Sequence, residues 1–251
     1  MSGDREIRGA GTAEASWQSW QGWQALPEVD AAQLAPAGSR TLILAPHPDD
    51  ELLGCGGLIR ALVQLGREVL LVAVTDGGAS HPDSSEWPPE RLKRQRSRET
   101  ADALGLLGAA PVTVMRLGLD DGQVAAQAGR LQQALDLLVR PGDVMVATCR
   151  FDGHPDHEAV GAAAAQAAVR RRATLLEMPV WMWHWAEAGD QRVPWDRACR
   201  LRLDAAAQQA KRSAVQAYRS QLEPDPSTGR DAIVPPTALA RLLRDEEVYF
   251  R

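Results

Sequence analysis

Two short segments rich in histidine and carboxylate side chains hold the residues best suited to chemistry. Each contains the tripeptide His-Pro-Asp, and together they hold three of the chain's five histidines. The polar residues of the two segments are His47, Asp49, Asp50 and Glu51, followed by His154, Asp156 and His157. Imidazoles and carboxylates crowded together are costly to bury unless a cation lies among them. The pattern therefore predicts a metal site in preference to two hydrogen-bonded surface turns.

The spacing of these residues favours a catalytic metal centre. His47 and Asp50 are three residues apart, so one turn can direct both at one ion, and a histidine of the second segment completes the set. Two histidines and one carboxylate with open positions suit catalytic zinc or non-haem ferrous iron, and bound water would have its pKa lowered toward ~7. Asp49 is then the expected general base. The spare histidine would stabilise the oxyanion or act as an acid, oriented by Asp156.

Each segment directly follows an apolar run typical of a buried parallel strand. The strands expected from such runs cover residues 41–45, 68–75, 112–117 and 143–148, and the helices expected between and after them cover 52–65, 89–107, 128–139 and the stretch ending near 172. This alternation predicts an α/β fold with a Rossmann-like, mainly parallel sheet and helices on both faces. Both segments would then lie at the C-terminal rim of the sheet, where such folds bind ligands.

The remaining chain is expected to complete one domain over residues 1–251, of which 1–35 form an N-terminal arm and a tryptophan-bearing helix. Residues 1–16 read as a loose arm. Trp17, Trp20 and Trp23 recur every third residue, which favours a helix packing its indoles on the domain over a subunit contact or a cleft wall. The stretch 175–185 is expected to be a further strand because its indoles alternate, and 246–250 a short edge strand.

Composition excludes several classes of partner. The net charge of −5 argues against nucleic acid and anionic membranes, and no apolar stretch approaches membrane-spanning length. Three widely spaced cysteines with no CxxC pair favour a reducing compartment, and the polar N-terminus lacks a signal core, so the cytoplasm is expected.

The other two histidines, His81 and His184, are expected at strand ends on the same rim of the sheet. Each is either a pocket-lining residue or a structural one.

The quoted motifs resemble those of one enzyme family. Ala45-Pro46-His47-Pro48-Asp49-Asp50-Glu51 with the glycines at 54, 56 and 57, paired with His154-Pro155-Asp156-His157, is similar to the PIG-L/LmbE-like zinc-dependent N-acetylglucosaminyl deacetylases. The resemblance covers residues 40–160 and continues weakly to the end. It implies that His47, Asp50 and His157 bind zinc, that Asp49 is the general base, and that His154 is the electrostatic or acid partner of the tetrahedral intermediate.

Weaker matches imply further contacts. Arg96, in an R-x-x-E helix, and Asp121, in an Asp-Gly loop, resemble the family's substrate-binding residues. Lys211 and Ser220-Gln221 are family-like as well and are given a structural role. The tryptophan-rich stretches have no place in the family pattern.

The expected function is removal of an N-acyl group, in the first place acetyl, from an amino sugar or its conjugate. A small N-acylated molecule is the expected partner, and homo-oligomers stay open. The first alternative is a zinc amidohydrolase acting on a non-sugar N-acyl compound whose apolar part the tryptophans hold. Two others are a ferrous oxygenase and a binding module with a vestigial metal site, although such a module would not need Asp49 as a base.

Overall fold

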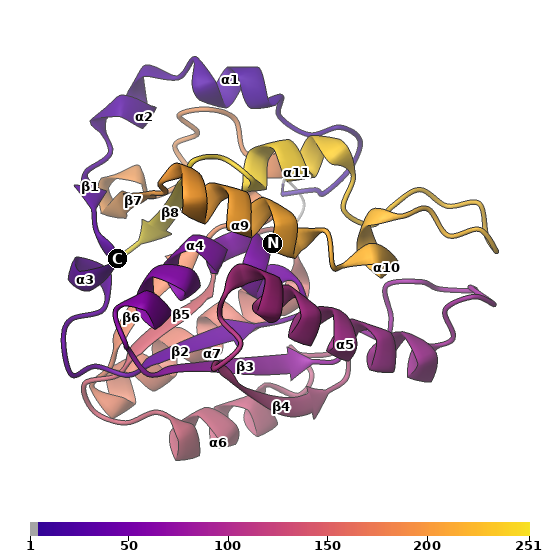
Figure 1. The fold of residues 1–251 in the computed structure, drawn as a ribbon, viewed down its shortest axis with the longest axis horizontal. Helices are drawn as coiled ribbons and strands as arrows, with labels where there is room; N and C mark the ends of the chain where they lie inside the picture. Colours follow the sequence, from indigo (N-terminus) through magenta and orange to yellow (C-terminus); the bar gives the residue numbers. More distant parts are fainter. Residues whose placement is uncertain (1–4) are drawn as a thin grey trace.

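The computed structural model describes residues 5–251, in which one eight-stranded mixed sheet lies between helices (Figure 1). The strand order is β1-β7-β8-β6-β5-β2-β3-β4. The strands are β1 Glu28–Val29, β2 Thr41–Ala45, β3 Val69–Thr75, β4 Thr113–Leu119, β5 Val144–Thr148, β6 Thr174–Met178, β7 Ala198–Arg202 and β8 Glu246–Phe250. Only β8 runs antiparallel to its neighbours, β6 and β7, so the predicted mainly parallel sheet is confirmed.

Helices cover both faces of the sheet. They are α1 Glu14–Gln18, α2 Gln21–Ala25, α3 Ala31–Leu34, α4 Asp50–Gln64, α5 Pro89–Leu107, α6 Ala128–Leu138, α7 Pro155–Arg171, α8 Met182–Trp185, α9 Ala205–Val215, α10 Arg219–Leu222 and α11 Pro236–Leu242, with a 3₁₀ turn at Trp195–Arg197. Alternate residues of β2 belong to different cores. Ile43 is in the core that includes residues of α4, α5 and α9, and Leu42 and Leu44 are in the core that includes residues of α6 and α7. The buried apolar strands thus build two cores.

The strand order reverses beside β2. From β2 the chain proceeds through α4 to β3 and through α5 to β4, whereas β5 pairs with the other side of β2 and leads through α7 to β6. Open parallel sheets form a crevice at such a reversal, outside the carboxyl ends of the strands. The two His-Pro-Asp segments follow β2 and β5, so the topology places both at this crevice.

Two close approaches explain the glycines at the start of α4. A Cβ on Gly54 would lie 2.6 Å from Met178 Sδ, and one on Gly57 would lie 2.3 Å from a Leu203 methyl group. The helix is interrupted at Cys55, and the free backbone N–H groups of Gly57 and Leu58 donate to the Glu247 carboxylate at 2.7 and 2.9 Å. A residue far along the chain therefore caps the second half of α4.

Two expectations for the C-terminal half need correction. The strand predicted over 175–185 is confirmed for 175–178, which belong to β6, but 182–185 form the short helix α8, because the Asp152 carboxylate accepts hydrogen bonds from the backbone N–H groups of Val180, Trp181 and Met182. Strand β8 exists as predicted but lies inside the sheet, between β7 and β6. Its carboxylates can be buried because Glu246 pairs with Arg200 and Glu247 with Lys211.

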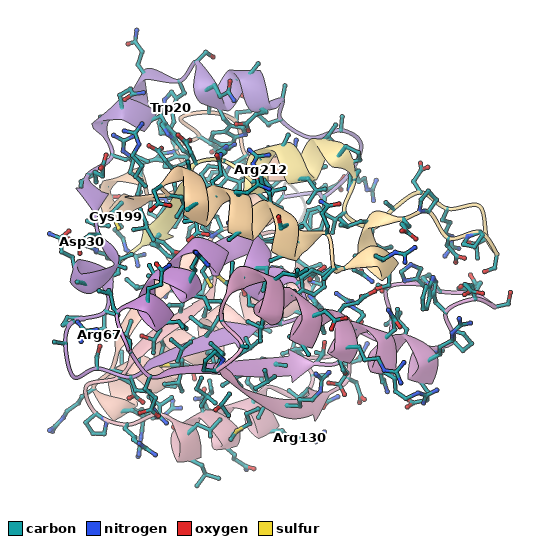
Figure 2. All side chains as sticks on the ribbon, in the orientation of Figure 1. Trp20, Asp30, Arg67, Arg130, Cys199 and Arg212 are labelled. Atoms are coloured by element: carbon teal, nitrogen blue, oxygen red, sulfur yellow. The ribbon has the colours of Figure 1, made fainter. Side chains whose placement is uncertain are left out.

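The tryptophans at the N-terminus pack on the domain, as predicted, but from two short helices. Trp17 is buried with its ring 5.0 Å from that of Trp183, and the Trp20 ring lies 4.6 Å from that of Trp195. Trp20, labelled in Figure 2, belongs to the link between α1 and α2. Dispersion and ring–ring contacts among these indoles fix both helices to the sheet.

The arm before α1 is anchored by polar contacts. Arg241 donates to the carbonyl oxygens of Ala10 and Thr12, and Arg5 pairs with Glu158 at 2.9 Å. The expected loose arm is thus wrong for residues 5–12, and the first four residues of the predicted arm lie outside the described residues. Within the described part of the chain, no helix has the length and apolar character needed to cross a membrane.

Candidate metal centre and active site

The two segments bring three ligand-type atoms to nearly equal separations. His47 Nδ1 lies 3.2 Å from His157 Nε2, and Asp50 Oδ2 lies 3.4 Å from the first of these atoms and 3.3 Å from the second. Three donors bound tetrahedrally to zinc at about 2.0–2.1 Å are roughly 3.3 Å from one another. This ligand triangle of His47, Asp50 and His157 therefore has the size that one small divalent cation needs.

Carboxylates outside the triangle orient both imidazoles. His157 Nδ1 lies 2.7 Å from Asp152 Oδ2, and His47 Nε2 lies 3.2 Å from both Asp121 Oδ1 and Asp156 Oδ2. Each ring thus has a carboxylate that accepts the proton of its outer nitrogen, so the nitrogen in the triangle is the one available to a metal ion. The described residues accordingly hold a His/Asp site able to bind a metal ion, with His154 contributing a third nearby imidazole.

The charges around the triangle favour a cation. Burial alone would lower the pKa of His157, but the Asp50 charge and hydrogen bonds with Asp152 and Asp50 raise that pKa to about 9. Burial alone would raise the pKa of Asp50, but His157 and His47 hold it well below its ordinary value. The acidic groups therefore stabilise positive charge at this position.

Asp49 is held apart from the triangle by an unusual backbone turn. Its φ of 134° is rare for a residue with a side chain. Glu51 Oε2 accepts the Asp49 backbone N–H at 3.1 Å, Tyr218 donates its hydroxyl to Glu51 Oε1 at 2.6 Å, and Arg96 lies 3.3 Å from Asp49 Oδ1. Burial, opposed by the Arg96 charge, raises the pKa of Asp49 to about 7. The turn therefore presents a weakly basic carboxylate beside the triangle.

His154 begins α7 and stays outside the triangle. Its Nδ1 accepts the backbone N–H of Asp156 at 3.3 Å, so the proton of the neutral ring belongs on Nε2. Burial, together with the charges of His157 and His47, lowers the pKa of His154 to about 4. The Asp156 carboxylate accepts backbone N–H groups of the 122–124 loop and lies beside His47, not beside the His154 ring that the sequence predicted it to orient.

A cavity of about 420 Å³ adjoins the triangle. It is lined by Ile7, His47, Asp49, Asp50, Leu53, Ala79, Ser80, Arg96, Asp121, Gly122, His154, Val180, Trp181, Gln221, Ile233 and Val234. The two substrate-binding candidates, Arg96 and Asp121, both reach it, but each is already engaged. Arg96 donates to the carbonyl oxygens of Pro48 and Gly77, and Asp121 accepts the backbone N–H of Ala79. They therefore fix the walls of the cavity as well as facing it.

Sequence reasoning gave no role to Asp152 or Glu51 and left two histidines with alternative roles. Asp152 lies two residues before His154, and its position beside a predicted ligand loop was the available signal. Glu51 contacts the backbone N–H of Asp49, which depends on an unusual turn, and the hydroxyl of the distant Tyr218, so neither contact leaves a sequence signal. His81 and His184 are not among the residues lining the cavity: His184 contacts Arg241 and the Arg8 carbonyl, and His81 contacts Ser80.

Gln221 was expected to be structural, but it also lines the cavity. Its side-chain nitrogen donates to Ser220 Oγ at 3.0 Å, and that hydroxyl donates to Glu99 at 2.6 Å, which assigns the nitrogen and oxygen of the amide. Within residues 5–251, Gln221 Oε1 is buried without a hydrogen-bond partner. A buried acceptor left unpaired is costly unless a ligand or water supplies a donor.

Comparison with known proteins agrees with this geometry. The family model described as PIG-L, GlcNAc-PI de-N-acetylase, matches residues 42–168, which is half of the chain and includes both His-Pro-Asp segments. The chain belongs to the PIG-L family. The resemblance inferred from its motifs is therefore confirmed.

Curated relatives of this PIG-L family chain are deacetylases. The diacetylchitobiose deacetylase of Thermococcus kodakarensis is 27% identical over 124 residues, covering 49% of this chain and 46% of the relative. The 1D-myo-inositol 2-acetamido-2-deoxy-alpha-D-glucopyranoside deacetylase 1 of Saccharopolyspora erythraea is 32% identical over 133 residues, covering 52% and 41%. The PIG-L family chain thus spans about half the length of the curated relatives it matches.

Solved structures share the fold. The N,N'-diacetylchitobiose deacetylase from Pyrococcus horikoshii superposes with a TM-score of 0.58 at 21% identity, covering 73% of this chain and 70% of that one. The conserved protein TT1542 from Thermus thermophilus superposes with a TM-score of 0.53 at 28% identity, covering 73% and 80%. The predicted Rossmann-like α/β class is confirmed.

Proposed function

We propose that this chain is a metal-dependent hydrolase that removes an N-acyl group, in the first place acetyl, from an amino sugar or its conjugate. The observation that carries the proposal is the ligand triangle opening on a cavity that Asp49 and His154 also face. The family membership supports the reaction, and the names of the curated relatives, which act on acetylated amino sugars, support the substrate class.

We propose zinc as the metal, held by His47, Asp50 and His157. Two imidazoles and one carboxylate with an open position form a donor set that catalytic zinc sites use, although ferrous iron accepts the same donors. When bound, such a cation supplies Lewis-acid polarisation of the amide carbonyl and acidifies a water molecule.

The chain's own residues would carry the proton transfers. Asp49 takes a proton from the water that attacks the carbonyl carbon, because its carboxylate faces the cavity from the edge of the triangle. His154 carries its proton on Nε2 and donates a hydrogen bond to the carbonyl oxygen as negative charge develops there. The protonated Asp49 then gives its proton to the amine nitrogen as the C–N bond breaks, which yields a carboxylic acid and a free amine. The proton of the acid then passes to the amine, which leaves a carboxylate and an ammonium group.

Three polar residues would position the sugar. Asp121 and Arg96 face the cavity from one side, and Gln221 offers its unpaired Oε1 to a hydroxyl or to the amide N–H. Asp121 also orients His47, and Arg96 also holds Asp49, so substitution of either residue would disturb the chemistry as well as binding.

The test combines metal analysis with an assay of released acetate. We expect purified protein to bind about one zinc per chain and to release acetate from N-acetylglucosamine, diacetylchitobiose or their conjugates. His47→Ala should lose both metal and activity, and Leu137→Ala, a change on the exposed surface of α6, should lose neither. Full activity in metal-free protein, or retention of the metal in His47→Ala, would contradict the proposal.

We also propose a reducing compartment, the cytoplasm, as the site of action. The three cysteines are buried free thiols, one each in α4, beyond β5 and in β7. Thiols persist in this form where the cell keeps them reduced. Cell fractionation tests this assignment.

A further inference from the structure

Five apolar residues that line the active-site cavity come from three segments that lie far apart in the sequence. Ile7 comes from the N-terminal arm, Val180 and Trp181 from the link between β6 and α8, and Ile233 and Val234 from the loop before α11. We call these five residues the apolar wall. All of them lie outside the residues matched by the family model, whereas His47, Asp49, Asp50 and His154 lie within that match.

The chain holds Trp181 in place through the metal-site residue Asp152. The Asp152 carboxylate accepts the backbone N–H of Trp181 at 3.0 Å and those of its two neighbours at 2.8 and 3.0 Å, while it also contacts His157 Nδ1. The position of this indole relative to the triangle is therefore fixed by one buried group.

The other two segments are anchored as well. The carbonyl oxygen of Arg8, next to Ile7, lies 3.0 Å from His184 Nε2. The Val234 backbone N–H donates to the Gln221 carbonyl oxygen at 3.0 Å, which ties the loop before α11 to α10. These contacts make the apolar wall a defined part of the fold.

The wall leaves apolar surface open to the cavity. Three of its side chains are only half-buried, those of Ile7, Trp181 and Ile233, whereas Val180 and Val234 are buried. Among residues 5–251, no group accepts a hydrogen bond from the Trp181 indole N–H, whereas those of Trp17 and Trp185 donate to carbonyl oxygens. The half-buried ring can therefore meet a ligand with both its face and its N–H.

A bare sugar does not match this wall. Its hydroxyl groups would lose their hydrogen bonds to water against Ile7, Val180 and Ile233 without gaining others. The polar partners Arg96, Asp121 and Gln221 belong to other parts of the cavity lining and suit the sugar ring.

We propose that the substrate carries an apolar group of several carbon atoms, which packs against Ile7, Trp181 and Ile233 while the amide lies at Asp49 and His154. This inference rests on the proposed deacylase function and narrows its substrate class to N-acyl amino sugars with an alkyl or aryl substituent. The substituent is either the acyl chain or the aglycone, and both chemistries fit the same apolar surface.

The experiment compares four substrates on the metal-loaded, full-length protein. They are N-acetylglucosamine, its methyl glycoside, its octyl glycoside and N-octanoylglucosamine. We expect kcat/KM for one of the octyl compounds to exceed that of the methyl glycoside by about tenfold or more, the range that added methylene groups give in an apolar pocket. A preferred octyl glycoside identifies the aglycone as the apolar group, and preferred N-octanoylglucosamine identifies the acyl chain.

Variants test whether the preference for an octyl substrate depends on the apolar wall. Trp181→Ala and Ile7→Ser should each lower the ratio of kcat/KM for the preferred octyl compound to that for the methyl glycoside toward one. The matched controls are Trp87→Ala, which removes an indole outside the cavity, and Leu137→Ser, on the exposed face of α6. Both controls should keep the ratio of the unmodified protein. Equal hydrolysis of methyl and octyl compounds by the unmodified protein would overturn the inference and leave the deacylase function standing.

Binding separates the two proposals if no compound is hydrolysed. Calorimetry with Asp49→Asn measures binding of both glycosides and of N-octanoylglucosamine without turnover. Tighter binding of an octyl compound than of the methyl glycoside, lost in the double variant with Trp181→Ala, supports the wall even where the deacylase function fails. Equal affinities for all three ligands overturn it.

Discussion

The first His-Pro-Asp segment and the second leave neighbouring parallel strands at the same edge of the sheet, yet their matching residues lie differently. In both, the residue three positions after the histidine enters the ligand triangle: Asp50 in the first segment and His157 in the second. The leading histidine enters it only in the first, because His47 turns Nδ1 inward whereas His154 begins α7 and accepts a backbone N–H.

The aspartates of the two tripeptides differ as well. Asp49 lies in a turn with φ of 134° and faces the cavity, whereas Asp156 lies in the first turn of α7 and accepts backbone N–H groups beside His47. The same tripeptide thus gives a base candidate in one segment and an orienting group in the other. Backbone conformation, and not residue type, decides the difference.

The largest effect is expected at the position three residues after each histidine. Asp50→Ala and His157→Ala should each lose the metal and all measurable activity, because each removes a corner of the triangle. His154→Ala should keep the metal while turnover falls about 10²–10³-fold, the usual cost of one oxyanion donor. Elemental analysis and acetate release check these outcomes. Metal loss in His154→Ala would show that His154, like His47, is a metal ligand, and would contradict the difference between the two segments.

The next largest effects are expected at the two aspartates, whose variants should differ in metal binding and in turnover. Asp49→Asn should keep the metal and lower turnover about 10²–10⁴-fold, because the general base is gone. Asp156→Asn should act through His47 and weaken metal binding about 10–100-fold with a smaller effect on turnover at saturating zinc. Zinc titration of both variants, followed by kcat at saturation, distinguishes the roles. Asp49→Ala losing the metal would contradict the assignment of Asp49 as a base.

A third effect concerns Asp152, which contacts a histidine of the second segment and none of the first. Asp152→Asn should weaken zinc binding about 10–100-fold, because the amide holds His157 Nδ1–H less firmly than the carboxylate does. Asp136→Asn, a change at an exposed ion pair between α6 and α7, is the control and should bind zinc normally. Competition with a chelator measures both affinities. Unchanged zinc affinity in Asp152→Asn would remove its orienting role.

The smallest effect is a pH dependence of stability from a pair that lies near the second segment. Burial would raise the pKa of Glu177 in β6, but hydrogen bonds and charge from Arg150, in the loop that leads to that segment, lower it below the ordinary value. This carboxylate therefore adds stability above its unfolded pKa of about 4.3, and the contribution is lost as the pH falls through the lower folded value. Arg150 is partly exposed, so we expect about 1 kcal/mol or less.

Urea unfolding between pH 3 and pH 6 measures this contribution. The free energy of unfolding of Glu177→Gln should depend less on pH than that of the unmodified chain, with the two curves converging at the acid end. Asp136→Asn again serves as the control, because its ion pair is exposed. Parallel curves for Glu177→Gln and the unmodified chain would show that the pair with Arg150 adds nothing.

The sequence was sufficient for the parallel half of the fold. Strands β2, β3 and β5 are apolar except for one terminal threonine each, so their burial on both faces and the helices between them could be predicted from the residues alone. The two segments that follow β2 and β5 lie close together because these strands are parallel neighbours in the sheet. The expected ligands His47, Asp50 and His157 therefore lie together in the structure, although their metal-binding role still awaits the experiments above.

The features that the sequence did not predict, helix α8 and the inner position of β8, depend on contacts between residues that are distant in the chain. Helix α8 was predicted as strand because its indoles alternate, and the backbone donors at its start are satisfied by Asp152, 28 to 30 residues earlier. Strand β8 was predicted as an edge strand but lies inside the sheet, where the distant residues Arg200 and Lys211 pair with the buried carboxylates of Glu246 and Glu247. Local periodicity carries no information about such remote partners.

Asp152 has a consequence for how this scaffold can diverge. One carboxylate fixes both a metal-facing imidazole and the backbone that carries Trp181. A mutation that shifts residues 180–182 to admit a new ligand would also disturb the geometry around His157. Selection for altered specificity should therefore accumulate changes at Ile233 before it alters Trp181, because the loop that carries Ile233 is anchored to Gln221 and not to Asp152.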